Sequence, residues 1–263
     1  MGNYETLKYE VAENGIANVM ISQPKTLNAV GRHVFEEMGR LLYEIRADDR
    51  VRCVVISGDG RAFSAGGNLG EMKEGYGDNR DFFFFMQEVN QTTAKLVDLP
   101  KPVIAKVHGA AMGAGMNIVL SADIAVAADD VKFSELFGNV GLIPDCAGTY
   151  LLARTVGRSK AKEIIFTRRT ILADEALELG IVTKVVPREE LDAAVQELAE
   201  KIAEGPTFAF ALGKQIINRS FEIDLNTALA MEGMAQAMAG NSQDHKEGVA
   251  AFFEKRKADF QGK

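Results

Sequence analysis

The sequence predicts an α/β protein in which helices cover a mostly parallel sheet. Short apolar runs at 51–57, 103–107 and 124–128 have the length of buried strands, and segments with helical spacing separate them. Strands that are apolar throughout are typical of sheets covered on both faces. With 263 residues, 47% of them hydrophobic, the chain can bury a large core without a disulfide or metal.

The first half of the chain alternates between the two kinds of element. Asn14-Gly15 is a strong hairpin turn signal between two strand-like runs. After it, Val34, Met38 and Leu41 recur at helical spacing. The expected order is a hairpin over 4–22, a helix over 32–48, a strand over 51–57, a glycine-rich loop over 61–80, a helix over 81–98, a strand over 103–107, a helix over 114–122 and a strand over 124–128.

Beyond Pro144 the apolar pattern is helical, apart from a short strand expected at 182–186. The change of pattern near residue 190 divides the chain into a core over 1–190 and a helical C-terminal region over 191–263. Gly205-Pro206 predicts a break within that second region.

Composition and charge exclude several classes of function. A net charge of −7 argues against nucleic-acid binding, because such proteins usually carry a basic patch. No apolar run approaches the ~20 residues of a membrane span. Two cysteines are too few for a zinc cluster, and Cys53 in an apolar run is expected to be a reduced core thiol. The N-terminus lacks a basic or apolar leader, so we expect a cytoplasmic protein.

Two glycine-rich segments, 62–69 and 108–117, each follow a buried strand. Ligands of open α/β sheets bind at this edge, and glycine lets backbone N–H groups face them. Close packing of helix and strand is an alternative explanation. The spacing of Gly109, Gly113 and Gly115 does not match the Gly-x-Gly-x-x-Gly dinucleotide motif. Spacing alone leaves the ligand open.

A third segment, 142–157, carries an acid. Pro144 and Gly157 frame a predicted helix, because proline favours a first helical position and glycine a position past the end. Asp145 would then lie in the first turn, where a carboxylate complements the helix dipole. The same carboxylate at the edge of an apolar pocket could instead move a proton.

These segments together resemble the enoyl-CoA hydratase/isomerase (crotonase) family over nearly the whole chain. The similarity includes both glycine-rich loops, the segment from Pro144, residues 24–30 and residues 247–256. It implies a crotonase-type (ClpP/crotonase) spiral of ββα units with a helical C-terminal region. It also implies an acyl-CoA substrate, no metal, no cofactor besides coenzyme A as part of the substrate, and a homotrimer or dimer of trimers assembled through residues 191–263.

The resemblance also implies site residues. Members of the family bind the thioester oxygen with two backbone N–H groups, which fall on Ala65 and Ala114 in this sequence. Removing a proton next to a thioester puts negative charge on that oxygen, and one such donor is worth about 3–4 kcal/mol. The residues expected to contact substrate or coenzyme A are Leu27, Ala65, Gly66, Gly67, Asn68 and Ala114.

Departures from the family pattern bear on the reaction. The two glutamates of the hydratases would fall on Asn117 and Phe137, and Glu135 is two residues out of register, so we expect it to be a surface or packing acid. Asp145 remains, in a segment that most resembles the ring-1,2-epoxyphenylacetyl-CoA isomerase branch. One carboxylate favours shifting a double bond or rearranging a ring over adding water.

Other functions stay open. The alternatives are an enoyl-CoA hydratase with a non-standard acid and a catalytically weak acyl-CoA-binding subunit. A dehalogenase of the family is disfavoured because the chain has no tryptophan for its aromatic cage.

Four smaller features complete the expectations. Phe82 to Phe85 predict a helix buried on more than one side. The family resemblance implies that some of their rings lie near the acyl group. We expect His108 to be structural, Asp123 to make local hydrogen bonds and Lys255 to be a candidate for phosphate contact.

Overall fold

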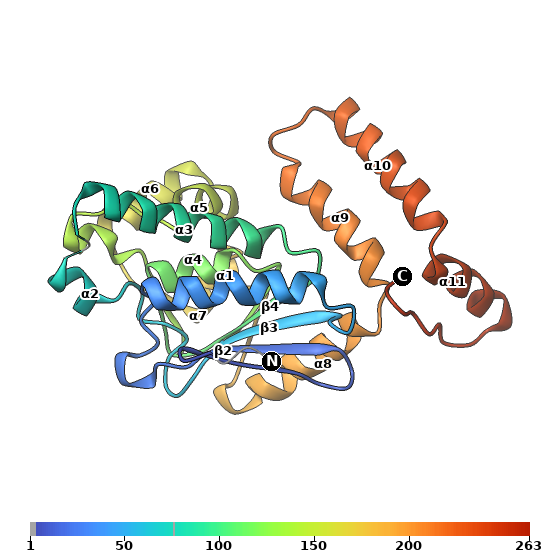
Figure 1. Cartoon of the computed structure of the whole chain (residues 1–263), viewed down its shortest axis with the longest axis horizontal. Coiled ribbons are helices and arrows are strands. Elements are labelled where there is room, and N and C mark those ends of the chain that lie inside the picture. Colours follow the sequence, from blue (N-terminus) through green and yellow to red (C-terminus); the bar gives the residue numbers. More distant parts are fainter. Residues whose placement is uncertain (1–3, 76) are drawn as a thin grey trace.

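The computed structural model describes residues 4–75 and 77–263, and a six-stranded sheet is its centre (Figure 1). The strand order is β1-β2-β3-β4-β6-β9, and only β1 runs antiparallel to its neighbour. The strands are β1 (Leu7–Val11), β2 (Ile16–Ile21), β3 (Cys53–Gly58), β4 (Val103–Val107), β6 (Ile124–Ala128) and β9 (Lys184–Val186). This confirms the predicted α/β class.

Helices cover both faces of the sheet because successive side chains of a strand point to opposite sides. Val54 and Ile56 of β3 pack in the larger core, with apolar residues of α1 (Arg32–Ala47), α3 (Asn79–Val97) and α4 (Ala114–Leu120). Cys53 and Val55 of the same strand face α8 (Leu191–Ala203) in a second, smaller core. Figure 1 shows α1 and α3 on one side of the sheet and α8 on the other.

A second sheet of three short strands lies beside the first. Its order is β5 (Ala110–Met112), β7 (Lys132–Ser134), β8 (Ile171–Leu172), with β5 and β7 parallel. The remaining elements are η1 (Pro24–Thr26), α2 (Leu69–Glu74), η2 (Leu136–Val140), α5 (Gly148–Val156), α6 (Arg158–Thr167), α7 (Ala173–Glu178) and η3 (Arg188–Glu190). Strands β5, β7 and β8, of two or three residues each, were not predicted.

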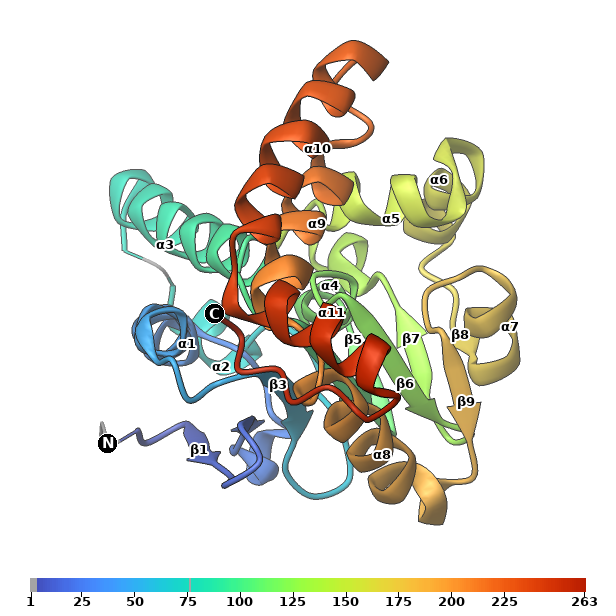
Figure 2. The ribbon, with the colours of Figure 1, turned by 90° about the vertical axis from the view of Figure 1, so that its right-hand side faces the viewer.

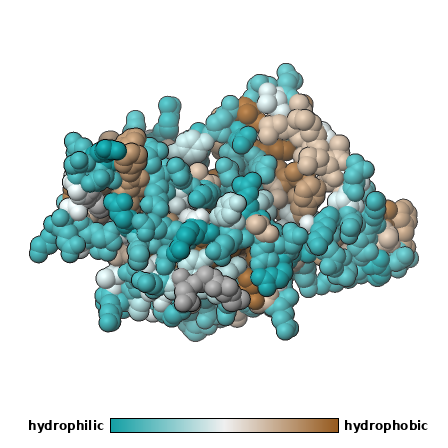
Figure 3. Space-filling view, in the orientation of Figure 1, coloured by the Kyte–Doolittle hydropathy of each residue, from teal (hydrophilic) through white to brown (hydrophobic). Residues whose placement is uncertain are grey.

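The last three helices extend away from the sheet (Figures 1 and 2). They are α9 (Thr207–Arg219), α10 (Leu225–Gly240) and α11 (Gln243–Glu254), and the predicted break at Gly205-Pro206 precedes α9. The division at residue 190 stays a prediction, although α8, which it assigns to the C-terminal region, packs on the sheet. Exposed apolar side chains gather on α9 and α10, where Figure 3 shows a hydrophobic area; they include Phe210, Ile217, Leu225, Leu229 and Met234.

The run of phenylalanines departs from expectation. Only Phe85 is buried, while Phe83 and Phe84 are 57% and 55% exposed. Their rings meet edge to face at 5.9 Å on the outer side of α3. The prediction of a helix buried on more than one side is therefore wrong, because successive helical residues point ~100° apart and α3 packs through one face.

Candidate active site

The two glycine-rich loops meet at the carboxyl ends of β3 and β4. Ser64 forms a parallel bridge with Ala111: its N–H donates to the carbonyl of Ala110 at 2.9 Å, and its carbonyl accepts from Met112 N at 3.0 Å. Gly66 lies where the loops are closest, with φ +92°, and a Cβ there would stand 2.7 Å from the Met112 oxygen. Only glycine allows this approach.

A cavity of about 350 Å³ opens beside this junction. Its walls come from both loops, from the segment before α1 and from η2. The lining residues are Thr26, Ala29, Ala65, Gly66, Gly67, Asn68, Leu69, Gly70, Met72, Gly113, Ala114, Leu136, Phe137, Asn139 and Val140. The walls are mostly apolar or backbone, as in sites for apolar groups with one polar attachment point.

The expected pair of backbone donors needs one correction. The Ala65 N–H donates to the carbonyl of Leu27 at 2.8 Å, so it is already used within the fold. Two residues on, Gly67 lines the cavity, and its N–H has no hydrogen-bond acceptor among the described residues. Ala114 is the first residue of α4, where an N–H has no partner within its helix, and it meets none in the rest of the described chain. The open donors are therefore those of Gly67 and Ala114.

Two other predicted binding residues have structural tasks. Leu27 does not line the cavity; it takes a left-handed conformation with φ 54° and holds the loop through Ala65. Asn68 does line it, but its side-chain oxygen caps α2 by accepting from the N–H groups of Gly70 and Glu71. Gly66 and Gly67 lie in the wall as expected.

Asp145 lies before a helix rather than in its first turn. Helix α5 begins only at Gly148, because Cys146 and Ala147 adopt left-handed conformations with φ 47° and 59°. The prediction that Pro144 opens the helix is therefore wrong. The explanation of Asp145 as a first-turn acid that complements the helix dipole is therefore also wrong.

The Asp145 segment is tied to α4 by Asn117, which is fully buried and lies one turn beyond Ala114. The Asn117 side-chain N–H donates to the Asp145 carbonyl at 2.9 Å. Gly148 makes room for this contact, since a Cβ there would stand 2.3 Å from the Asn117 nitrogen. Asp145 does not line the cavity itself, although Asn117 connects it to the helix that supplies the Ala114 donor.

The carboxyl of Asp145 is partly exposed, and burial raises its pKa, an effect that the neighbouring Cys146 thiol opposes. One of its oxygens, Oδ1, is buried without a hydrogen-bond partner among the described residues. A carboxyl in such surroundings accepts a proton more readily than a solvated one.

Glu135 is 0% exposed, so of the two expected roles the surface acid is excluded and the packing acid remains. Burial first, and then the negative charge of Asp145, raises its pKa to about 8. The sequence pattern places Glu135 two residues away from the position of the family's glutamate. Its place directly after β7 nevertheless brings it beside the Asp145 segment.

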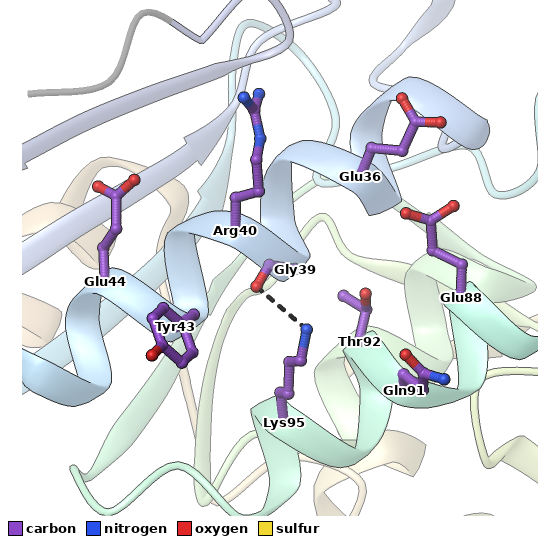
Figure 4. Close-up of a pocket in the computed structure, with 9 residues that line it drawn as sticks. All are labelled: Glu36, Gly39, Arg40, Tyr43, Glu44, Glu88, Gln91, Thr92 and Lys95. Carbon is purple, nitrogen blue, oxygen red and sulfur yellow. Dashed lines mark hydrogen bonds between the residues drawn. The ribbon is translucent and has the colours of Figure 1, made fainter.

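Other candidate features lie elsewhere. His108 contacts the Gly60 carbonyl at 2.9 Å, and Asp123 accepts from Val103 N and Lys214 Nζ, as the structural roles expected of both require. A groove of about 380 Å³ between α1 and α3 has charged walls, and in it Lys95 donates to the Gly39 carbonyl (Figure 4). Within residues 4–75 and 77–263, no group of three or more His, Cys, Asp and Glu is placed to hold a metal, and no helix is long and apolar enough to cross a membrane.

Comparisons with known proteins agree with this geometry. The sequence model of the family described as enoyl-CoA hydratase/isomerase matches residues 11–263. The chain is 37% identical to the 1,2-epoxyphenylacetyl-CoA isomerase of Escherichia coli K12, covering 95% of this chain and 97% of that protein. It is 39% identical to a short-chain-enoyl-CoA hydratase of Clostridium acetobutylicum, covering 94% of each. The crystal structure of an enoyl-CoA hydratase from Bacillus anthracis superposes with a TM-score of 0.93 at 32% identity, covering 98% of this chain and 100% of that one.

Proposed function

Because the chain belongs to the enoyl-CoA hydratase/isomerase family, we propose that it is an enoyl-CoA isomerase in which Asp145 moves a proton along the acyl chain. The same chemistry would serve to rearrange a ring of an aromatic-derived acyl-CoA. The observation that carries the proposal is the half-buried Asp145, whose backbone carbonyl is joined through Asn117 to the helix of the Ala114 donor.

The open N–H groups of Gly67 and Ala114 would bind the thioester oxygen. Loss of a proton from the carbon next to the thioester converts its carbonyl into an enolate, which places negative charge on that oxygen. Two preorganised donors in a cavity with largely apolar walls stabilise this charge more than water does. One of these donors, Ala114, stands at the start of α4, whose dipole adds a further favourable field.

Asp145 would take the proton and return it two carbons away. In a 3-enoyl-CoA the base removes a proton from C2 to give a dienolate. The enolate electrons then form the C2–C3 double bond, while the electrons of the C3–C4 double bond take up the proton at C4. No atom is gained or lost, so one carboxyl that alternates between charged and neutral forms is sufficient. Its raised pKa suits that alternation.

Hydration of an enoyl-CoA is the second candidate. It requires one group to activate water and a proton source for the acyl chain. The observation in its favour is a second acid, Glu135, close enough to Asp145 for the Asp145 charge to raise its pKa. Against it, Glu135 is fully buried, whereas Asp145 is partly exposed.

Parallel assays with two substrates separate these candidates. The purified chain is incubated with a 3-enoyl-CoA and, separately, with crotonyl-CoA. We expect conjugated 2-enoyl-CoA to appear from the first and no loss of enoyl absorbance from the second. Rapid loss of that absorbance would instead assign hydration. Failure to turn over either substrate, with acyl-CoA still bound, would assign a binding subunit.

We also propose that the chain forms a homotrimer or a dimer of trimers through α9 to α11. The exposed apolar side chains on these helices support this, because monomeric proteins rarely expose such clusters. Sedimentation equilibrium tests it, and a monomer at micromolar concentration would reject it.

A further inference from the structure

Unpartnered polar atoms concentrate at the candidate site. Six buried side-chain nitrogen or oxygen atoms have no hydrogen-bond partner among the described residues, and four of them belong to Asn117, Glu135 and Asp145. They are Asn117 Oδ1, both carboxyl oxygens of Glu135 and Asp145 Oδ1. Buried polar atoms are nearly always paired, so such a cluster needs an explanation.

The fold brings these three residues together from separate elements. Glu135 follows β7, whose Ser134 carbonyl accepts from Gly113 N at 2.8 Å, which fixes Glu135 beside the start of α4. Asn117 lies one turn along α4 and binds the Asp145 backbone through its side-chain nitrogen. That bond uses one of the two N–H donors of the amide, and the Asn117 oxygen is an open acceptor.

The groups around Glu135 supply negative charge and no positive charge. Asp145 and the Cys146 thiol, from the segment before α5, are the titratable groups that interact with it, and Asn117 faces it from α4. No cation among the described residues contributes to its pKa. Arg168, the nearby base, lies against Gly138 instead.

A proton on Glu135 resolves this arrangement. An ionised Glu135 would be a fully buried charge with no cation beside it among the described residues, and only the Asn117 side chain would favour it, which is a costly state for a side chain. A neutral carboxyl gains an O–H donor, and both available acceptors, Asn117 Oδ1 and Asp145 Oδ1, are unpartnered. Burial and the Asp145 charge raise the pKa of Glu135 to about 8, in agreement with this.

We propose that Glu135 and Asp145 form a buried carboxyl pair in which Glu135 keeps its proton and donates it in a hydrogen bond that holds Asn117 and Asp145 in place. This rests on the proposed function in one respect, which is that Asp145 exchanges protons with the substrate. Glu135 does not line the cavity and acts through Asp145, so it is a positioning residue. Its own proton stays in place during turnover, while a second one passes between Asp145 and the acyl chain.

The pH dependence of stability tests the proton on Glu135. An unfolded glutamate releases its proton near pH 4.5, whereas folded Glu135 releases it near pH 8. The folded state therefore binds more protons between these values, and stability falls as pH rises through that window. We expect the wild-type melting temperature to drop from pH 5 to pH 8 by roughly 5 °C more than that of Glu135→Gln. If the melting temperatures of the two proteins change equally with pH, the proposal is wrong.

Two substitutions test the hydrogen bond separately from the charge. Glu135→Gln keeps a permanent donor, so its kcat/KM at pH 7 should stay within about threefold of wild type. Any decline of kcat/KM that wild type shows above pH 8 should be absent in this variant. Glu135→Met has a similar size and no donor, so we expect a loss of at least tenfold. Equal kcat/KM and equal pH profiles for the two variants would reject the positioning role.

If the Glu135 variants do not fold, Asp145→Asn still tests the carboxyl pair. Removing the Asp145 charge lowers the proton affinity of Glu135, so the pH window of stability loss should move to lower pH than in wild type. An unmoved window would reject the pair. The activity of the same variant reports on the proposed function, so the two ideas can fail independently.

Discussion

Glu37 and Glu135 are both enclosed by the protein, at 3% and 0% exposure, yet their surroundings are opposite. Glu37, on α1, accepts hydrogen bonds from Glu5 N at 2.8 Å, Thr6 N at 2.8 Å and the Thr6 hydroxyl at 2.6 Å. Burial alone would raise its pKa, but these donors outweigh burial and lower it. Glu135 accepts no hydrogen bond, and its pKa is raised.

The difference separates an acid that holds the fold from acids that can exchange protons. Glu37 joins the start of the chain to α1, and its hydrogen bonds favour the carboxylate, so it holds no proton to exchange at neutral pH. At the site, Asn117, Glu135 and Asp145 have buried polar atoms without a hydrogen-bond partner among the described residues. Perturbed acids without fixed partners are typical of functional sites, whereas satisfied ones are typical of structure.

Asp145→Asn should have the largest effect, because it removes the group that carries the proton while keeping its shape. We expect kcat for 3-enoyl-CoA isomerisation to fall about 10²–10⁴-fold, with acyl-CoA binding little changed. Steady-state kinetics and calorimetric titration with a non-reactive acyl-CoA would measure the two quantities. Unchanged turnover would place proton transfer on another residue.

Ala114→Pro should have the next largest effect, because proline removes one of the two open donors. The first position of a helix tolerates proline, so α4 should still form. We expect kcat to fall about 10²–10³-fold, the typical cost of losing one oxyanion donor.

The matched control is Ala173→Pro, at the first position of α7 and outside the cavity wall. It should leave kcat unchanged. A variant at position 114 that melts normally and remains fully active would remove Ala114 from the oxyanion site.

Glu37→Gln should act on stability alone. The folded pKa of Glu37 lies below its unfolded value, so its contribution is present above about pH 4.5 and is lost as pH falls through the folded pKa. We expect unfolding at pH 7 to need about 2–3 kcal/mol less free energy than in wild type, and the gap to close towards pH 3. Urea denaturation measures both, and a gap that widens on acidification would contradict the assignment.

Much of this structure could be predicted from the sequence, and the failures have physical causes. Long periodic elements such as α1 and the apolar strands β3, β4 and β6 follow directly from residue pattern. The start of α5 does not, because two non-glycine residues, Cys146 and Ala147, take left-handed conformations that no local pattern indicates.

The site shows the same limits. The glycine loops and Asp145 could be identified from their motifs. The shift of the open donor from Ala65 to Gly67 depends on a bond to Leu27, 38 positions away in the chain (65 − 27). The burial of Glu135 depends on three-residue strands too short to predict. Such tertiary contacts decide which of several polar groups remains unpaired.

Carboxyl NMR of the wild-type chain carrying ¹³C-labelled glutamate, titrated from acid to alkaline pH, tests this contrast most directly. We predict one resonance that titrates near pH 8 and disappears in Glu135→Gln. We predict another that titrates below the ordinary pKa of a glutamate and disappears in Glu37→Gln. A Glu135 resonance that titrates at or below pH 4.5 would contradict the account, because the site would then hold no proton on its buried acid at neutral pH.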